Sequence, residues 1–323
     1  MVRNLKGKIL AFILLAVALL AAGCGESSQT ASELKTVEEY SDAQVKLIAI
    51  TEKNRYSKVY TDEIWQIPVD EEGTSFQDYL LGEVRVFLQE LKTVNLLADE
   101  QNITLTSQEK DRLHELTEDY YDSLTEADRT YTGISKEEIY EFYAEYYRAD
   151  KVVNELTKDV NLEISDSEAK VITVLEIRLE DNGEAQRIHT QVMKEGVDFN
   201  AVAKTFSRDE QVEKSIGRGE RPQEYEDAVF AMTTGEISPI IREGDSFYIV
   251  KCISDYDEEA TLERKQKMAL QRKNQAFRKI YDVFAAEHPV ELKGKVWEQI
   301  AFSSAKDTAT SDFFQWYEDY MGS

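Results

Sequence analysis

The sequence predicts an α+β protein in which a helical domain, built from both ends of the chain, carries an inserted module of strands and short helices. Apolar residues recur at steps of three and four before about residue 168, as in helices that bury one face. At Val171 the pattern changes to β-branched residues that alternate with others, and after residue 256 helical spacing returns. An insertion within a helical domain explains this order best.

The composition is that of an acidic, folded protein. The chain has 323 residues, of which 42% are hydrophobic, and its 63 acidic against 38 basic residues give a net charge of −25. A chain of this length and apolar content can bury a sizeable core. The negative surface repels phosphate backbones, so no nucleic-acid partner is expected.

Residues 1–23 are predicted to be a signal peptide, since a basic start is followed by an apolar run over residues 9–22. That run suits secretion and is short for a permanent bilayer span. Its end, LLAAGC, resembles a bacterial lipobox, which implies that Cys24 becomes a lipidated N-terminus on the extracytoplasmic face of the cell membrane. The alternative is an ordinary signal peptide with an accidental cysteine. Cleavage brings the net charge to −28 and leaves Cys252 without a second free cysteine, so no internal disulfide is expected. The small, polar and acidic residues 24–40 are predicted to be a tether.

Residues 41–168 are predicted to form the N-terminal part of the helical domain. One helix is expected after the capping residue Ser75, with further helices after Thr106 and Ser135, each of which is followed three residues later by Glu. The apolar face of the first helix consists of Tyr79, Leu80, Val84, Phe87, Leu88 and Leu91.

The helix after Ser135 carries an aromatic stripe. It consists of Tyr140, Tyr143, Tyr146, Tyr147, Val152 and Leu156. Such a stripe either packs into the helical core or forms an exposed surface for unfolded chains.

Residues 169–256 are predicted to form a separate module. The run VITVLEIRL from Val171 indicates a strand, and SFYIVKCIS at 246–254 indicates the closing strand. Two helices are expected between them, the second capped by Asp198, and residues 217–238 indicate a turn, a helix, a second turn and the start of a strand.

Residues 257–323 are predicted to be a C-terminal helical segment that packs on the N-terminal part. A helix is expected over 261–286, ending near Pro289. Its predicted buried face consists of Phe277, Ile280, Tyr281 and Phe284. The tail SDFFQWYEDYMGS is either a final packed helix or an exposed hook.

Two stretches of the central module carry a family resemblance. GVDFNAVAKTFSRD at 196–209 is similar to the parvulin pattern Gly-x-Asp-Phe-x-x-x-Ala-x-x-Tyr/Phe-Ser, and PQEYEDAVFAMTTGEISPII at 222–241 is similar to the parvulin run that ends in a Gly-Glu-Ile-Ser turn and an edge strand. With its lipobox-like start and flanking helices, the chain resembles the PrsA and SurA type of extracytoplasmic foldase. The resemblance implies a four-stranded antiparallel sheet wrapped by helices. It also implies a groove for X-Pro segments of unfolded or newly secreted polypeptides, with residues 217–238 as one wall.

The resemblance also implies the residues of a peptidyl-prolyl isomerase site. Parvulins carry a histidine on the first and on the last strand, and here these positions hold Glu176 and Tyr248. Asp209 stands where the family has Asp or Cys, Tyr225 where it has a socket phenylalanine, and Arg221 where it has a methionine. The resemblance thus implies a degenerate site with Asp209, Glu176 and Tyr248 as catalytic positions, and with Tyr225, Arg221, Phe230 and Met232 binding the substrate.

The loss of both imidazoles leads to a specific hypothesis. If Glu176 and Tyr248 lie on neighbouring strands, the phenol can donate to the carboxylate and form a satisfied polar floor that is scaffold and not catalyst. Alternatively, an uncompensated Glu176 under an apolar roof would have a raised pKa and could act as an acid. The three histidines of the chain, His114, His189 and His288, are interpreted as surface or packing residues.

Neither a cofactor nor a metal is expected. The sequence has no Cys/His cluster with zinc spacing, no phosphate-binding glycine loop and no Asp-rich calcium loop. Three functions stay open: a membrane-tethered foldase that mainly holds its clients and has weak or lost isomerase activity, an active isomerase, and an envelope scaffolding or ligand-binding lipoprotein. The sequence leaves the clients and the oligomeric state undetermined.

Overall fold

The computed structural model describes residues 37–322, so the predicted signal peptide, Cys24 and most of the predicted tether lie outside the described residues. The chain divides into two compact units. One contains residues 37–159 and 274–322 and is called the helical unit; the other, Val160–Lys273, is called the sheet unit. Among the described residues, no helix is both long and apolar enough to cross a membrane.

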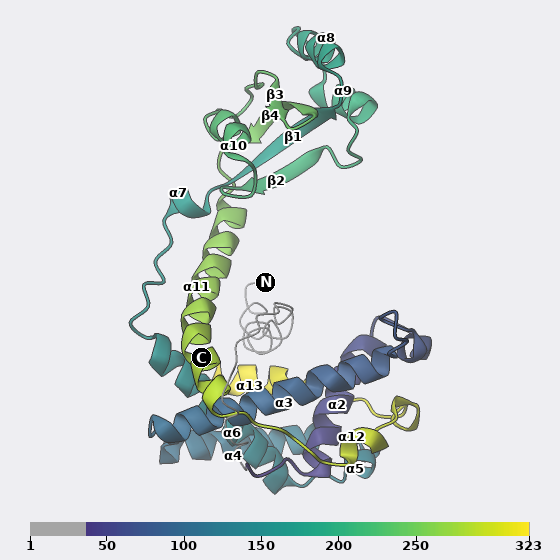
Figure 1. Cartoon of the computed structure of the whole chain (residues 1–323), viewed down its shortest axis with the longest axis vertical. Coiled ribbons are helices and arrows are strands. Elements are labelled where there is room, and N and C mark those ends of the chain that lie inside the picture. Colours follow the sequence, from purple (N-terminus) through teal and green to yellow (C-terminus); the bar gives the residue numbers. More distant parts are fainter. Residues whose placement is uncertain (1–36, 323) are drawn as a thin grey trace. The chain divides into compact units, whose positions relative to one another are not determined.

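The helical unit is made of α-helices and two short 3-10 helices (Figure 1). Its elements are α2 (Asp42–Ser57), η3 (Asp62–Gln66), α3 (Phe76–Glu100), α4 (Ser107–Ser123), α5 (Glu126–Thr132), α6 (Lys136–Thr157), α12 (Val296–Gln299), η4 (Phe302–Ser304) and α13 (Phe313–Met321). The long helix α11 (Glu258–Glu287) begins in the sheet unit and ends in the helical unit.

The three predicted helix starts are confirmed. The Ser75 side chain accepts a hydrogen bond from a backbone amide of the first turn of α3. Thr106 with Glu109 and Ser135 with Glu138 form complete capping boxes at α4 and α6, so each pair satisfies two backbone amides that would otherwise lack partners. Helix α5, which the sequence analysis missed, lies between these two helices in the chain.

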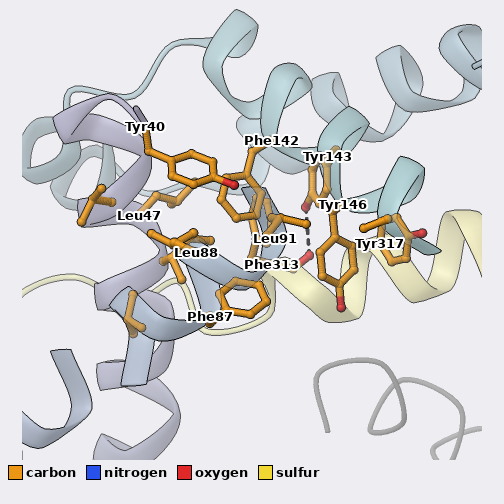
Figure 2. Close-up of a cluster of buried hydrophobic side chains, with 14 of the residues drawn as sticks. Tyr40, Leu47, Phe87, Leu88, Leu91, Phe142, Tyr143, Tyr146, Phe313 and Tyr317 are labelled. Atoms are coloured by element: carbon orange, nitrogen blue, oxygen red, sulfur yellow. Dashed lines mark hydrogen bonds between the residues drawn. The ribbon is translucent and has the colours of Figure 1, made fainter. Parts of the chain in front are cut away.

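The aromatic stripe of α6 and the C-terminal tail pack together in the core of the helical unit (Figure 2). Tyr143 and Tyr146 are no more than 1% exposed, and the Tyr143 hydroxyl donates to the Phe313 carbonyl at 2.9 Å. The rings of Tyr143 and Phe313 stack with centroids 4.2 Å apart. Tyr140 and Tyr147 are half-buried at the edge of the cluster. The packing interpretation is therefore confirmed for the stripe, and the tail is a packed helix.

Two predicted details of burial are wrong. Tyr40, assigned to the tether, is buried, and its hydroxyl donates to Glu145 Oε2 at 2.8 Å. The packed part of the chain therefore begins before α2. On α11, Ile280 is 39% exposed and lies off the face that packs into the core. The members of that face that are buried as predicted are Phe277, Tyr281 and Phe284.

The sheet unit contains a four-stranded antiparallel sheet with strand order β2-β1-β4-β3. Its strands are β1 (Val171–Leu179), β2 (Glu213–Gly217), β3 (Ile241–Glu243) and β4 (Ser246–Ser254), and its short helices are α7 (Asp166–Ala169), α8 (Asn182–Val192), α9 (Phe199–Phe206) and α10 (Gln223–Val229). The predicted first and closing strands are confirmed as β1 and β4, and Asp198 caps α9 as expected. The predicted α+β fold class is therefore confirmed.

Side-chain alternation along β1 separates two cores. Odd-numbered residues such as Ile177 pack with α8 and α9, whereas even-numbered residues such as Val174 pack with α10, because successive side chains of a strand point to opposite faces of the sheet. Helices α8 and α9 are thus separated from α10 by the sheet (Figure 1). Glu176 belongs to the even-numbered set, so its carboxylate lies on the α10 face.

Candidate isomerase-like site

A buried carboxylate forms the floor of the candidate site. Glu176 is 0% exposed, and it faces Val250 of β4 in the strand register. Tyr248 faces Arg178, which is the next residue along the same face of β1. The predicted bond from Tyr248 to Glu176 is wrong. The phenol that reaches the carboxylate belongs to Tyr225 of α10, and it donates to Glu176 Oε2 at 2.5 Å.

Two cations complete the neutralisation of Glu176. Lys214 Nζ of β2 lies 2.6 Å from Glu176 Oε1, and Arg221 Nη1 lies 3.5 Å from Oε2. Burial, followed by the charge of Glu176, raises the pKa of Tyr225, so its hydroxyl stays protonated and continues to donate. The alternative of an uncompensated Glu176 is therefore wrong, since three groups donate to it.

Asp209 lies in the same network. Lys214 Nζ is 2.6 Å from Asp209 Oδ2, and Arg178 Nε donates to Oδ1 at 2.7 Å. Ser207 fixes this arrangement, because its hydroxyl accepts from the backbone amides of both Arg178 and Asp209. Burial alone would raise the pKa of Asp209, but the hydrogen bonds from Lys214 and Arg178 outweigh it and lower that pKa. Asp209 is therefore an acceptor of two ionic hydrogen bonds and a poor proton donor.

Lys214 joins the two carboxylates. It lies opposite Val174 on the neighbouring strand, so Glu176 is its diagonal neighbour on the same face. Burial alone would lower the pKa of Lys214, but its hydrogen bonds to Asp209 and Glu176 raise it. A single ammonium group thus holds together two acids that are far apart in sequence.

Arg221 covers the predicted socket. Its guanidinium lies 4.1 Å from the ring centroid of Tyr225 and 5.0 Å from that of Tyr248. It also forms a 2.6 Å ion pair with Glu243 Oε2 of β3. The two rings meet edge to face, with an interplanar angle of 90°. The groove expected for a prolyl ring is therefore occupied by a side chain of the protein itself.

The remaining predicted socket residues are also buried. Phe230 and Met232 are each 8% exposed and belong to the hydrophobic cluster on the α10 face. The guanidinium of Arg218 lies over the Phe230 ring at 4.6 Å. The structure thus gathers the predicted substrate-binding residues around α10, but as packed side chains.

Three members of the network, Lys214, Arg178 and Glu243, were not predicted from the sequence. Lys214 lies two residues before Ile216, so the two side chains lie on the same face of β2. This two-residue spacing is the sequence signal that could have placed a cation on the floor of the site. Arg178 lies two residues beyond Glu176 and could have been found in the same way. Glu243 could not, since its contact with Arg221 depends on the pairing of a three-residue strand.

The histidines do not join this site. His189 Nε2 lies 3.1 Å from the Ser238 carbonyl, and His114 stacks on a tyrosine of α6 with centroids 4.0 Å apart. His288 stacks on Phe284. The predicted packing roles are confirmed for His114 and His288. Within residues 37–322, no three His, Cys, Asp or Glu side chains are grouped so as to hold a metal ion.

Comparison with known proteins supports the resemblance. Residues 177–254 match the family model of the PPIC-type PPIase domain. The foldase protein PrsA of Caldanaerobacter subterraneus subsp. tengcongensis is 27% identical over an alignment of 299 residues, and the alignment covers 84% of this chain and 91% of that protein.

Solved structures of PrsA are also similar. PrsA from Bacillus cereus matches with 18% identity and a TM-score of 0.37, covering 78% of this chain and 98% of that one. PrsA from Streptococcus pneumoniae matches with 18% identity and a TM-score of 0.28, covering 73% and 98%. Residues 177–254 are therefore similar to a PPIC-type PPIase domain, in a chain that is similar to a PrsA foldase over 84% of its length.

Proposed function

We propose that this chain is a membrane-anchored, extracytoplasmic foldase that mainly holds unfolded secreted polypeptides and has weak or lost prolyl isomerase activity. The observation that carries the proposal is the guanidinium of Arg221, which lies over the rings of Tyr225 and Tyr248 and is paired with Glu243. A client proline must displace this group before it can reach the floor of the site.

Isomerase chemistry explains why this matters. Rotation about a peptide bond crosses a barrier of about 18–20 kcal/mol that amide resonance sets. An enzyme lowers this barrier by binding the twisted amide more tightly than the planar one, which calls for an apolar socket and for groups aimed at the amide. Here the hydroxyl of Tyr225 donates to Glu176, and Lys214 is shared between Glu176 and Asp209. These groups are already committed to one another, so they stabilise the sheet and not a twisted amide.

The similarity to PrsA foldases supports the wider role. It covers 84% of this chain and so extends well beyond the isomerase-like domain. The lipobox-like sequence before Cys24 and the acidic composition support an anchored protein that works outside the cytoplasm. Unfolded or newly secreted polypeptides are the clients that this role implies.

Two activities of the full chain test the proposal side by side. Cis/trans exchange is measured on a panel of X-Pro peptides, and suppression of aggregation is measured on an unfolded secreted protein. We expect no more than about a tenfold acceleration of exchange at stoichiometric protein, which corresponds to about 1.4 kcal/mol of the barrier, together with clear suppression of aggregation. Turnover at catalytic concentrations would refute the loss of activity, and failure to suppress aggregation would refute the holding role.

The anchor is tested separately. The Cys24→Ser chain should no longer incorporate labelled palmitate and should leave the membrane fraction, whereas Cys252→Ser should do neither. Cys252 is a suitable control because it is buried in the sheet unit. Labelling that persists in the Cys24→Ser chain would contradict the proposed anchor.

An active isomerase is the second candidate. Asp209 and Tyr225 occupy family positions and both lie in the network around Glu176. If Arg221 moves aside when a client binds, these residues come to line an open site. A proline-limited refolding assay separates this candidate from the first, because it measures catalysis on a real client.

A further inference from the structure

The site beneath Arg221 has the features of a cation cage. The rings of Tyr225 and Tyr248 lie at right angles with centroids 5.7 Å apart, and the guanidinium is within 5.0 Å of both centroids. Aromatic faces attract cations at such distances through their quadrupoles. Two perpendicular rings therefore offer a corner that suits a positive charge.

Two carboxylates complete the corner. Glu243 Oε2 lies 2.6 Å from the guanidinium of Arg221, and Glu176 Oε2 lies 3.5 Å from it. The Glu176 side chain is 0% exposed, whereas that of Glu243 is 29% exposed. A neutral prolyl ring in the place of Arg221 would remove a donor from both acids and supply none in return, whereas a second cation would replace the lost donor. The site thus favours a cation over the ring for which the fold is otherwise built.

The Arg221 side chain can rotate out of the site while the backbone around it stays in place. Its own amide and that of Gly219 both donate to Glu226 Oε1, at 3.1 and 2.6 Å, which fixes the loop before α10. The Arg221 side chain is 21% exposed, so solvent and a client chain both reach it. Ion pairs and cation–π contacts at partly exposed positions are weak. A change of rotamer therefore suffices to open the cage.

We propose that Tyr225, Tyr248, Glu176 and Glu243 form a binding site for a basic side chain of an unfolded client, which Arg221 closes in cis. An arginine of the client replaces the guanidinium of Arg221 by its own and restores the same contacts. The free energy of this exchange is therefore close to zero. Arginine suits the site better than lysine because a planar guanidinium stacks on a ring and pairs with a carboxylate at once. The net charge of −28 expected for the mature chain favours the approach of basic segments. This inference rests on the proposed function and specifies which client segments the domain selects.

The test uses the full chain with Arg221→Ala. Its probes are methylguanidinium and four peptides that are identical except for a central Arg, Lys, Pro or Leu. If the closed form holds about 90–99% of the wild-type molecules, removal of Arg221 strengthens binding of the Arg peptide by about 10- to 100-fold. The order of affinity should be Arg, Lys, then Pro and Leu. Methylguanidinium should raise the melting temperature of the variant and leave that of the wild type unchanged.

Two further variants serve as controls. Addition of Glu243→Gln to Arg221→Ala should remove most of the gain for the Arg peptide. Arg242→Ala should leave peptide binding at the wild-type level, since Arg242 is exposed, contacts the Gly244 carbonyl and lies over Phe247 instead of the cage. It is a matched loss of one arginine of the same unit, from the strand that carries Glu243.

A measurement on the wild type covers the case in which the variant does not fold. The Nε–H resonance of Arg221, assigned by its loss in Arg221→Lys, should shift when the Arg peptide is added and stay in place with the Leu peptide. The proposed cage would be overturned if the Pro peptide bound as tightly as the Arg peptide or more tightly. It would also be overturned if neither methylguanidinium nor the Arg peptide gave a response. Aggregation suppression that persists without any preference for arginine would refute the cage alone. A selective cage in a chain that does not protect clients would refute the proposed function alone.

Discussion

Replacement of Lys214 by methionine tests whether the floor of the site is held together by charge. Lys214 Nζ lies 2.6 Å from both Glu176 Oε1 and Asp209 Oδ2. Removal of one partner from a buried ion pair costs about 3–5 kcal/mol. The Lys214 side chain is 27% exposed, so solvent screens part of this energy, and Glu176 keeps the bond from Tyr225. We therefore expect Lys214→Met to lower the stability of the sheet unit by about 2–3 kcal/mol.

The distribution of tryptophans dictates the assay. The chain has three tryptophans, Trp65, Trp297 and Trp316, and all lie in the helical unit. Tryptophan fluorescence therefore reports the helical unit, whereas amide hydrogen exchange of β1 and β4 reports the sheet unit. A loss of about 2–3 kcal/mol makes exchange through opening of the sheet unit roughly 30- to 150-fold faster. The tryptophan transition in urea should stay unchanged.

Two matched changes identify the cause of the effect. Lys204→Met removes an exposed lysine of α9 in the same unit, and it should alter stability by no more than about 0.5 kcal/mol. Addition of Glu176→Gln to Lys214→Met removes the unpaired charge and should restore at least half of the loss. If Lys214→Met accelerates exchange of β1 by less than about threefold, Lys214 does not compensate Glu176 and the electrostatic account of the floor is wrong.

Three further substitutions, two in the helical unit and one in β2, have expected outcomes. Burial raises the pKa of Glu90 from 4.5 to about 7, although the neighbouring Arg278 lowers it. An acid with a raised pKa stabilises the fold fully below pH 4.5 and progressively less up to about pH 7, so Glu90→Gln should add about 2–3 kcal/mol at pH 8 and nothing at pH 4. A tryptophan-detected urea titration at both pH values checks this, and an equal gain at pH 4 would contradict it. Gly217→Ala places a Cβ atom 2.7 Å from Arg264 Cζ, whose guanidinium is held by a backbone carbonyl, and should cost about 1–3 kcal/mol by hydrogen exchange. Gly82→Ala, at an exposed position of α3, meets no atom within 4 Å and should stabilise the helical unit by up to about 1 kcal/mol, so a loss there would contradict the steric argument.

Local signals predicted the helix starts well, because their physics is local. The capping boxes at Thr106 and Ser135 involve residues three positions apart, and both exist in the structure. Helix α2 was missed although Ser41 and Gln44 form a capping box at its start. Its buried residues include polar ones and the unbroken run Leu47–Asn54, so no single apolar face marks it in the sequence.

The candidate site was predicted in part. The resemblance correctly led to Glu176, Tyr225 and Asp209 as members of one cluster, since strand parity and family pattern place them together. The partner of Glu176 was assigned wrongly because the register puts Tyr248 beside Arg178. A shift of one position along a face cannot be deduced from alternation alone, because alternation fixes the face but not the pairing.

Glu176 and Tyr248, at the two positions where the resemblance implies histidines, both contact Arg221. Glu176 is tolerated at full burial because Lys214 and Arg221 neutralise it and Tyr225 donates to it. Arg221 in turn needs Glu243, since with Glu176 alone it would have only a 3.5 Å contact. An imidazole at position 176 would take one carboxylate from both Lys214 and Arg221, and each cation would still be held in place by its other acid, Asp209 or Glu243. The charged floor follows from several compensating residues together, and a cation fits these residues better than a neutral ring does.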